Sequence, residues 1–107
     1  MVNIIHTTIT FEQAKRLAEE SASFFLSDFL KDAATPLLQE HYLEAEHCWM
    51  FFRNKDIAIP PDRPFCDGAY AISKKGNGSY IADLSDNPEK LQAYLQTMSN
   101  YFKQRGE

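Results

Sequence analysis

The 107-residue sequence predicts one α+β domain over residues 1–107: a long N-terminal helix, a three- to four-stranded antiparallel meander and a C-terminal helix. Three observations predict this class. Apolar residues recur at helical spacing near each end of the chain, and aromatic and β-branched residues dominate the middle. A Gly-Asn-Gly turn separates two of the middle segments. Because each helix carries one apolar stripe, we expect both helices to cover the same face of the sheet.

The N-terminal helix is predicted to begin at Thr10. Thr10 and Gln13 have the spacing of a capping box, in which each side chain bonds a free backbone N–H at the start of a helix. Thr35-Pro36 ends the segment, because the residue before proline disfavours the helical region, so we expect a helix over residues 10–33. Residues 1–9 are interpreted as a short strand or an ordered arm. The predicted buried stripe of the helix is Phe11, Ala14, Leu17, Ala18, Ala22, Phe25 and Phe29.

Residues 37–43 and 47–54 are predicted to be two strands joined by a tight turn at Glu44-Ala45-Glu46. The second segment is rich in aromatic residues, which strands favour. A helix over residues 37–46 competes with this interpretation, because the apolar residues of that segment would also share one helical face.

Residues 55–67 are predicted to form a loop stiffened by prolines. A loop of this length inside a compact domain is often functional. Gly76-Asn77-Gly78 then predicts a hairpin between strands 68–74 and 79–84, because glycine and asparagine tolerate positive φ angles.

The C-terminal helix, predicted over residues 88–103, has the clearest signal in the chain. Asn87 is a favourable N-cap, Pro88 suits the first helical position, and Gly106 suits the end of the helix. Its predicted buried stripe is Leu91, Tyr94, Leu95, Met98, Tyr101 and Phe102.

The strand at 47–53 is apolar on both of its faces, whereas a sheet with helices on one side only would show alternation. Its second face is therefore either covered by the long loop, through Ile57, Ile59 and Phe65, or exposed as an aromatic patch for a partner or a second copy.

Charge and composition narrow the function classes. The formal net charge of −4 argues against a nucleic-acid-binding protein with a basic face. The longest apolar runs are far too short to span a membrane, so we expect no membrane segment. The first residues lack a positively charged region followed by a long apolar run, so we expect no secretory signal, a cytoplasmic location and reduced thiols.

The sequence contains no recognisable catalytic motif. His41, His47, Cys48 and Cys66 are of metal-ligand type but lack the paired spacing of zinc sites, so we expect no metal and no cofactor. Asp67 beside Cys66 disfavours a thiolate nucleophile at that position. We therefore expect a protein that is not an enzyme.

A W-x-F pair in the aromatic strand, a glycine turn and an L-x-x-Y-L pattern in the last helix form a hydrophobic framework over about residues 37–102. Its residues are Trp49, Phe51, Ala71, Ile72, Ser73, Lys74, Gly76, Ile81, Ala82, Asp83, Leu84, Pro88, Leu91, Tyr94 and Leu95. This framework resembles that of the small immunity proteins of bacterial polymorphic-toxin systems, in particular the immunity protein 35 type. The resemblance implies neutralisation of a cognate toxin by direct binding, without catalysis.

The acidic balance adds an expectation about the contact surface. Many toxins of such systems are nucleases, whose phosphate-binding cleft is basic, and complementary charge speeds association. We therefore expect a basic toxin domain as partner of a monomer or homodimer. The expected contact residues are Glu40, Glu44, Glu46, Asp56, Asp62 and Asp67, with Trp49 or Tyr70 as an aromatic anchor. The alternative is a small acidic secretion chaperone that holds an effector segment along its sheet as a dimer.

Overall fold

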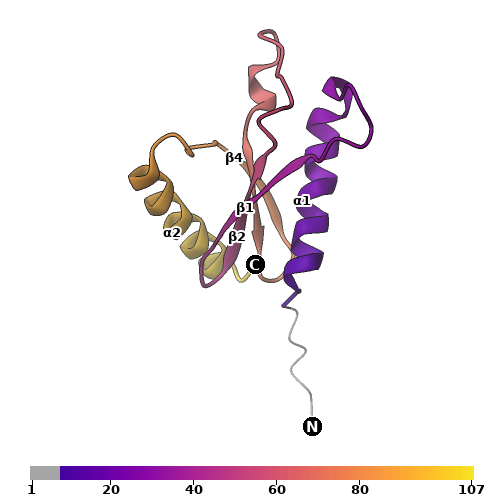
Figure 1. The fold of residues 1–107 in the computed structure, drawn as a ribbon. Helices are drawn as coiled ribbons and strands as arrows, with labels where there is room; N and C mark the ends of the chain where they lie inside the picture. Colours follow the sequence, from indigo (N-terminus) through magenta and orange to yellow (C-terminus); the bar gives the residue numbers. More distant parts are fainter. Residues whose placement is uncertain (1–7) are drawn as a thin grey trace.

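The structure, a computed structural model, describes residues 8–107 and confirms the α+β class. The strands form one four-stranded antiparallel sheet, and Figure 1 shows a helix on each side of it. The expectation for residues 1–7 lies outside the described residues. The elements are α1 (Phe11–Leu26), η1 (Ser27–Phe29), β1 (Leu38–Glu44), β2 (Cys48–Arg53), η2 (Pro64–Cys66), β3 (Ala69–Ser73), β4 (Gly78–Ile81) and α2 (Pro88–Arg105), where η marks a short 3₁₀ turn.

The sheet is a meander in the order β1-β2-β3-β4, so β1 and β4 are its two edges. The strand interpretation of the first segment is confirmed, and the competing helix is wrong. Aromatic side chains pair across all four strands: Tyr42 faces Phe51, Phe51 faces Tyr70, and Tyr70 faces Tyr80. Such cross-strand pairs stabilise a sheet and fix its register.

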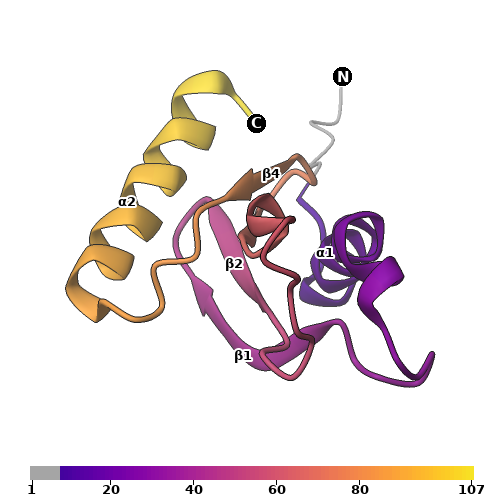
Figure 2. The ribbon, with the colours of Figure 1, turned by 90° about the horizontal axis from the view of Figure 1, so that it is seen from above.

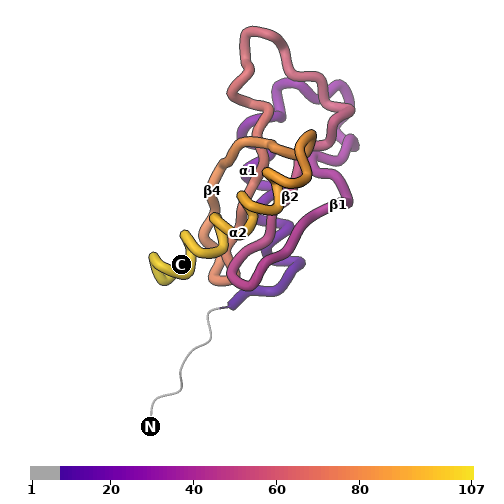
Figure 3. Tube along the Cα trace, turned by 90° about the vertical axis from the view of Figure 1, so that its left-hand side faces the viewer, coloured from indigo at the N-terminus to yellow at the C-terminus, as the bar shows by residue number. Residues whose placement is uncertain are grey.

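The two helices cover opposite faces of the sheet, which corrects the expectation that both share one face. In Figure 2, seen from above, α1 and α2 lie on either side of the strands, and Figure 3 gives the perpendicular view of the same arrangement. The core under α1 includes Trp49, Phe51, Ile57, Tyr70 and Ile72. The core under α2 includes Cys48, Met50, Phe52, Ala71 and Leu95.

Two covering layers explain why β2 is apolar on both faces. Successive side chains of a strand point to opposite sides, so the side chains on each face of β2 pack into one of the two cores. The long loop adds to the cover on the α1 side, where Ile57 is buried and Ile59 packs against the core. Phe65 does not take part in this cover and is exposed.

Both helix starts are capped as the sequence predicts. Thr10 and Gln13 form the reciprocal capping box, with bonds of 2.9 and 3.1 Å. The Asn87 side chain accepts a bond from the Lys90 N–H, and Gly106 ends α2 in the left-handed conformation at φ 70°. The buried Ser99 hydroxyl accepts a bond from the His47 N–H and ties α2 to the turn before β2.

Two elements are shorter than predicted, for one physical reason. The helix expected to reach residue 33 ends at Leu26, and Asp32 accepts a bond from the Ala34 N–H. The strand expected to reach residue 84 ends at Ile81, and Asp83 accepts a bond from the Ser85 N–H. Beyond each end, an aspartate side chain holds the local backbone in a turn, so neither the 32–34 segment nor the 83–85 segment extends the regular element.

Candidate interaction surface

Five large hydrophobic side chains among residues 8–107 are exposed: Phe24, Tyr42, Phe65, Tyr80 and Tyr101. Phe24 is 83% exposed and Phe65 is 62% exposed, whereas the phenyl rings of Phe51, Phe52 and Phe102 are almost fully buried. A single exposed apolar side chain is ordinary, but a contiguous group of them marks a contact surface. The positions of Phe24 and Phe65 therefore need to be traced through their neighbours.

Phe24 and Phe65 are linked through three rings in contact and one hydrogen bond to the Phe65 backbone. We call this group, Phe24, Phe25, Tyr80 and Phe65, the aromatic seam. The rings of Phe24 and Phe25 meet edge to face at 5.2 Å, and the ring of Phe25 stacks on that of Tyr80 at 4.1 Å. The Tyr80 hydroxyl then bonds the carbonyl oxygen of Phe65 at 2.6 Å. The seam thus joins α1, the edge strand β4 and the short turn η2, which are far apart in sequence.

The Tyr80 hydroxyl joins β4 to the end of the 55–67 loop through two hydrogen bonds. It donates to the Phe65 carbonyl and accepts from the Gly68 N–H, both at 2.6 Å. Burial raises the pKa of Tyr80, and this effect outweighs the opposing one of the Gly68 N–H, so the hydroxyl keeps the proton that it donates. Gly68 is required here, because a Cβ at this position would lie 2.5 Å from the Tyr80 ring and from the Ile81 carbonyl oxygen.

The rest of the 55–67 loop is held at its other end. Arg53 Nη1 donates to the Ile57 carbonyl at 2.7 Å, and Asn54 Nδ2 donates to the Pro36 carbonyl at 2.9 Å. Lys55 Nζ lies 3.0 Å from Oδ2 of Asp83, just beyond β4. Side chains from both ends of the loop therefore fix its path, and with it the position of Phe65.

Four exposed carboxylates lie near Phe24 or Phe65 along the chain. Glu20 lies four residues before Phe24 on α1, which is about one helical turn, and Asp28 lies four residues after it in η1. Asp67 follows η2 and is close enough to the Tyr80 hydroxyl to help raise its pKa. Asp62 precedes Arg63, whose guanidinium lies 5.9 Å from the centre of the Phe29 ring, and all four of these carboxylates are exposed.

The six acidic residues expected to form the contact surface do not lie together. Glu44 and Glu46 lie at the β1–β2 turn, Glu40 lies on edge strand β1, and Asp56, Asp62 and Asp67 lie in the loop at the opposite end of the sheet. Glu44 forms an ion pair with Lys74, and Glu46 lies 3.2 Å from His47. Of this group, Asp62 and Asp67 lie within three residues of Phe65 along the chain.

The aromatic anchors expected at Trp49 and Tyr70 are core residues. Trp49 is 5% exposed and lies under the Lys74 ammonium group, 4.2 Å from its ring centre, while Tyr70 is 1% exposed between Phe51 and Tyr80. Burial raises the pKa of Tyr70, whose hydroxyl has no partner among the described residues. Their burial removes both as partner anchors, because neither ring can reach a second molecule without opening the core.

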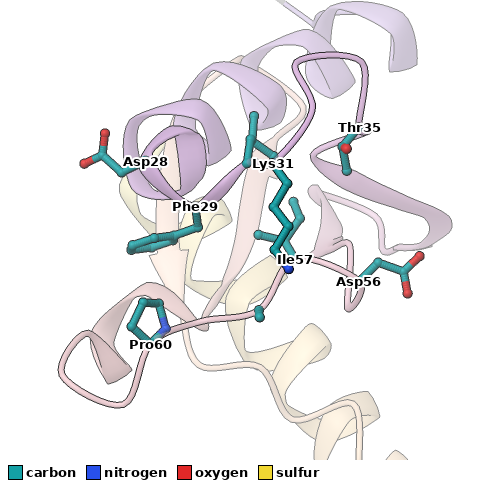
Figure 4. Close-up of a pocket in the computed structure, with 9 residues that line it drawn as sticks. Asp28, Phe29, Lys31, Thr35, Asp56, Ile57 and Pro60 are labelled. Atoms are coloured by element: carbon teal, nitrogen blue, oxygen red, sulfur yellow. The ribbon is translucent and has the colours of Figure 1, made fainter.

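Two cavities indent the surface outside the seam. One, of about 510 Å³, lies between η1 and the loop; Figure 4 shows Phe29 and Pro60 on its wall, Lys31 extended toward Ile57, and the Asp56 carboxylate pointing away. The other, of about 550 Å³, includes His47, Trp49, Lys74 and Lys75. In that second cavity Lys74 is engaged by Glu44 and Lys75 Nζ donates to the Gly106 carbonyl, so both ammonium groups have partners within the chain.

Neither cysteine is placed to act as a nucleophile. Cys48 and Cys66 are both free and buried. Burial raises the pKa of Cys48 to about 11, against the opposing effect of Lys74, so its thiol is protonated at neutral pH. Within residues 8–107 no three histidine, cysteine, aspartate or glutamate side chains gather as a metal site.

The seam was not predicted from the sequence, although the position of Phe24 on the N-terminal helix indicated an exposed ring. Phe24 falls outside the apolar stripe that the helical spacing defines, so the spacing itself places this ring on the solvent side of α1.

In the part of the chain that the structure describes, neither helix has the length and apolar character needed to cross a membrane. The chain matches no family model, no curated protein and no solved structure.

Proposed function

We propose that this protein is an immunity protein that neutralises a bacterial toxin domain by binding it directly. The aromatic seam carries the proposal. The chain buries Trp49, Phe51, Phe52, Tyr70 and Phe102 in its two cores. It leaves Phe24 and Phe65 mostly in water, where their exposed surface adds little to its own stability. Aromatic side chains are enriched at the centres of protein–protein interfaces, where they supply much of the binding energy.

The resemblance to immunity proteins supports the same role. The residues that carry it are framework residues: Trp49, Phe51 and Ile72 are buried under α1, and Leu91 and Leu95 are buried under α2. The buried framework residues therefore support a likeness in fold to such proteins. The exposed seam supplies the contact surface that direct binding of a toxin requires. The acidic net charge suits a basic toxin domain as the partner.

The test is co-expression with the protein encoded immediately upstream of this chain. We expect the C-terminal domain of that protein to arrest bacterial growth when expressed alone, and growth to return when this chain is expressed with it. The two purified proteins should elute together as one complex. Persistent growth arrest, or an upstream product that does not arrest growth, would contradict the proposal.

A titration separates binding from catalysis. Adding this chain in substoichiometric amounts to the purified toxin domain should inhibit only the matching fraction of toxin activity, because each molecule blocks one partner. An enzyme that inactivates the toxin would remove all activity at the same ratio after sufficient time. Gln96→Ala, an exposed change on α2 remote from the seam, serves as the control variant that should protect fully.

A further inference from the structure

We propose that the aromatic seam is the surface that contacts the toxin, and that the matching toxin surface is an apolar pocket bordered by lysine and arginine side chains. This inference rests on the proposed function and adds the place of contact and the chemistry of the partner. The apolar part of the seam consists of the rings of Phe24, Phe25 and Tyr80, which are in contact from α1 to β4. The exposed ring of Phe65 belongs to the residue whose carbonyl oxygen accepts the Tyr80 hydroxyl bond in η2.

Charge around the seam specifies the partner. Glu20, Asp28, Asp62 and Asp67 are exposed and lie within four residues of Phe24 or Phe65 along the chain, and Arg63 lies against the Phe29 ring. Four carboxylates around an apolar centre attract a surface with basic groups at its border, and such groups act mainly on the rate of association and on the choice of partner. The rings supply the contact that slows dissociation.

The loop end of the seam is held in place by side-chain hydrogen bonds. The Tyr80 hydroxyl fixes η2 through two bonds, and the Arg53 and Lys55 side chains fix the start of the same loop. Phe65 is therefore held in its exposed position before any partner arrives. A surface that is ordered in advance loses less conformational entropy on binding than a loop that must first become ordered.

A second copy of this chain fits the seam poorly. Two copies that met through it would bring two acidic borders together, and like charges across an interface oppose association. A basic partner meets no such opposition. The seam is thus better matched to a different protein than to itself.

The experiment measures association and dissociation rates between this chain and the toxin domain identified by growth arrest. Phe24→Ser with Phe65→Ser should weaken binding about 100-fold or more, mostly through faster dissociation. Asp62→Lys with Asp67→Lys should slow association about tenfold at low salt and reduce its salt dependence. The matched control, Glu40→Lys with Glu46→Lys, makes the same charge change at the β1 side of the sheet and should alter either rate by less than about threefold.

The fold of the seam variant is checked separately. Because Phe24 and Phe65 are mostly exposed, their replacement should move the thermal midpoint by less than about 3 °C. Full-strength binding by this folded variant, with weakening by the β1-side control instead, would overturn the inference while leaving the proposed function intact. A wild-type chain that binds no toxin domain would overturn both. A dimer in sedimentation that Phe24→Ser returns to monomer would make the seam a self-association surface and would also overturn it.

Discussion

Replacing Tyr80 by phenylalanine tests the link between the sheet and the loop. The change removes one oxygen atom and keeps the ring, so the stacking on Phe25 at 4.1 Å and the contact with Tyr70 remain. Two hydrogen bonds of 2.6 Å disappear, and the N–H of the buried Gly68 loses its partner. With about 1 kcal/mol for each bond and a further cost for the unpaired N–H, we expect a loss of about 2–3 kcal/mol in the free energy of unfolding.

Urea unfolding measures this loss. With a slope of about 1.5 kcal/mol per molar urea, the midpoint should fall by about 1.3–2 M while the slope stays the same. Tyr101→Phe is the matched control, because the exposed Tyr101 hydroxyl makes no hydrogen bond within residues 8–107 and its removal should shift the midpoint by less than about 0.3 M. Equal shifts for the two variants would refute the reasoning that the Tyr80 hydroxyl holds the loop.

Three further predictions concern the core and the loop. Leu95→Ala on the buried face of α2 should lower the free energy of unfolding by about 2–5 kcal/mol. The exposed Gln96→Ala should lower it by about 0.5 kcal/mol at most. Equal effects of the two substitutions in denaturant melts would place Leu95 outside the core. Cys48 should react with an alkylating reagent only after unfolding, because burial raises the pKa of its thiol to about 11; rapid labelling of the folded chain, followed by mass spectrometry, would contradict its burial. Burial raises the pKa of Asp83, but hydrogen bonds from Ser85 and Lys55 outweigh this effect and lower it overall, so its stabilising contribution is present above the ordinary carboxyl pKa of 3.8 and is lost as the pH falls below that value. Asp83→Asn should therefore lose less stability than the wild type between pH 6 and pH 3, and parallel losses in urea midpoints would refute this.

The elements of the fold could be predicted from local chemistry. Capping at Thr10 and Asn87, the glycine turn and the aromatic character of β2 each act within a few residues, and the structure confirms the elements that they predicted. The ends of α1 and β4 were placed too far along the chain. Asp32 and Asp83 compete there for the backbone, and propensity arguments give such single side chains little weight.

The placement of the helices could not be predicted in the same way. An apolar stripe shows that a helix must cover something, but it does not say which face of the sheet the helix covers. The pattern of β2 held the information: Cys48, Met50 and Phe52 on one face and Trp49 and Phe51 on the other need two covers. The second cover was expected from the loop or from a partner molecule. The loop does contribute Ile57 and Ile59, but on the α1 side, and the other face of β2 is covered by α2.

The candidate contact surface depends on contacts between distant parts of the chain. Phe25 and Tyr80 stack although 55 positions separate them, and Tyr80 bonds the backbone of Phe65 across a long loop. Linear sequence does show that Phe24 lies off the buried stripe, but not that a second exposed ring lies at the other end of the same group. The acidic residues expected to share one contact surface, in contrast, lie at opposite ends of the sheet: Glu44 and Glu46 at the β1–β2 turn, and Asp56, Asp62 and Asp67 in the loop after β2.

Framework and contact surface are therefore carried by different residues. Trp49, Phe51 and Ile72, which carry the resemblance, fill the core and set the fold, whereas Phe24 lies outside the segment 37–102 that the resemblance covers. Core side chains are closely packed, so a substitution at a buried framework position must keep nearly the same volume. A change at an exposed ring costs the folded chain little, so that surface is free to vary without loss of the fold. It follows that the framework residues inform the fold, and that the chemistry of the proposed partner has to be inferred from the seam and from the carboxylates near Phe24 and Phe65.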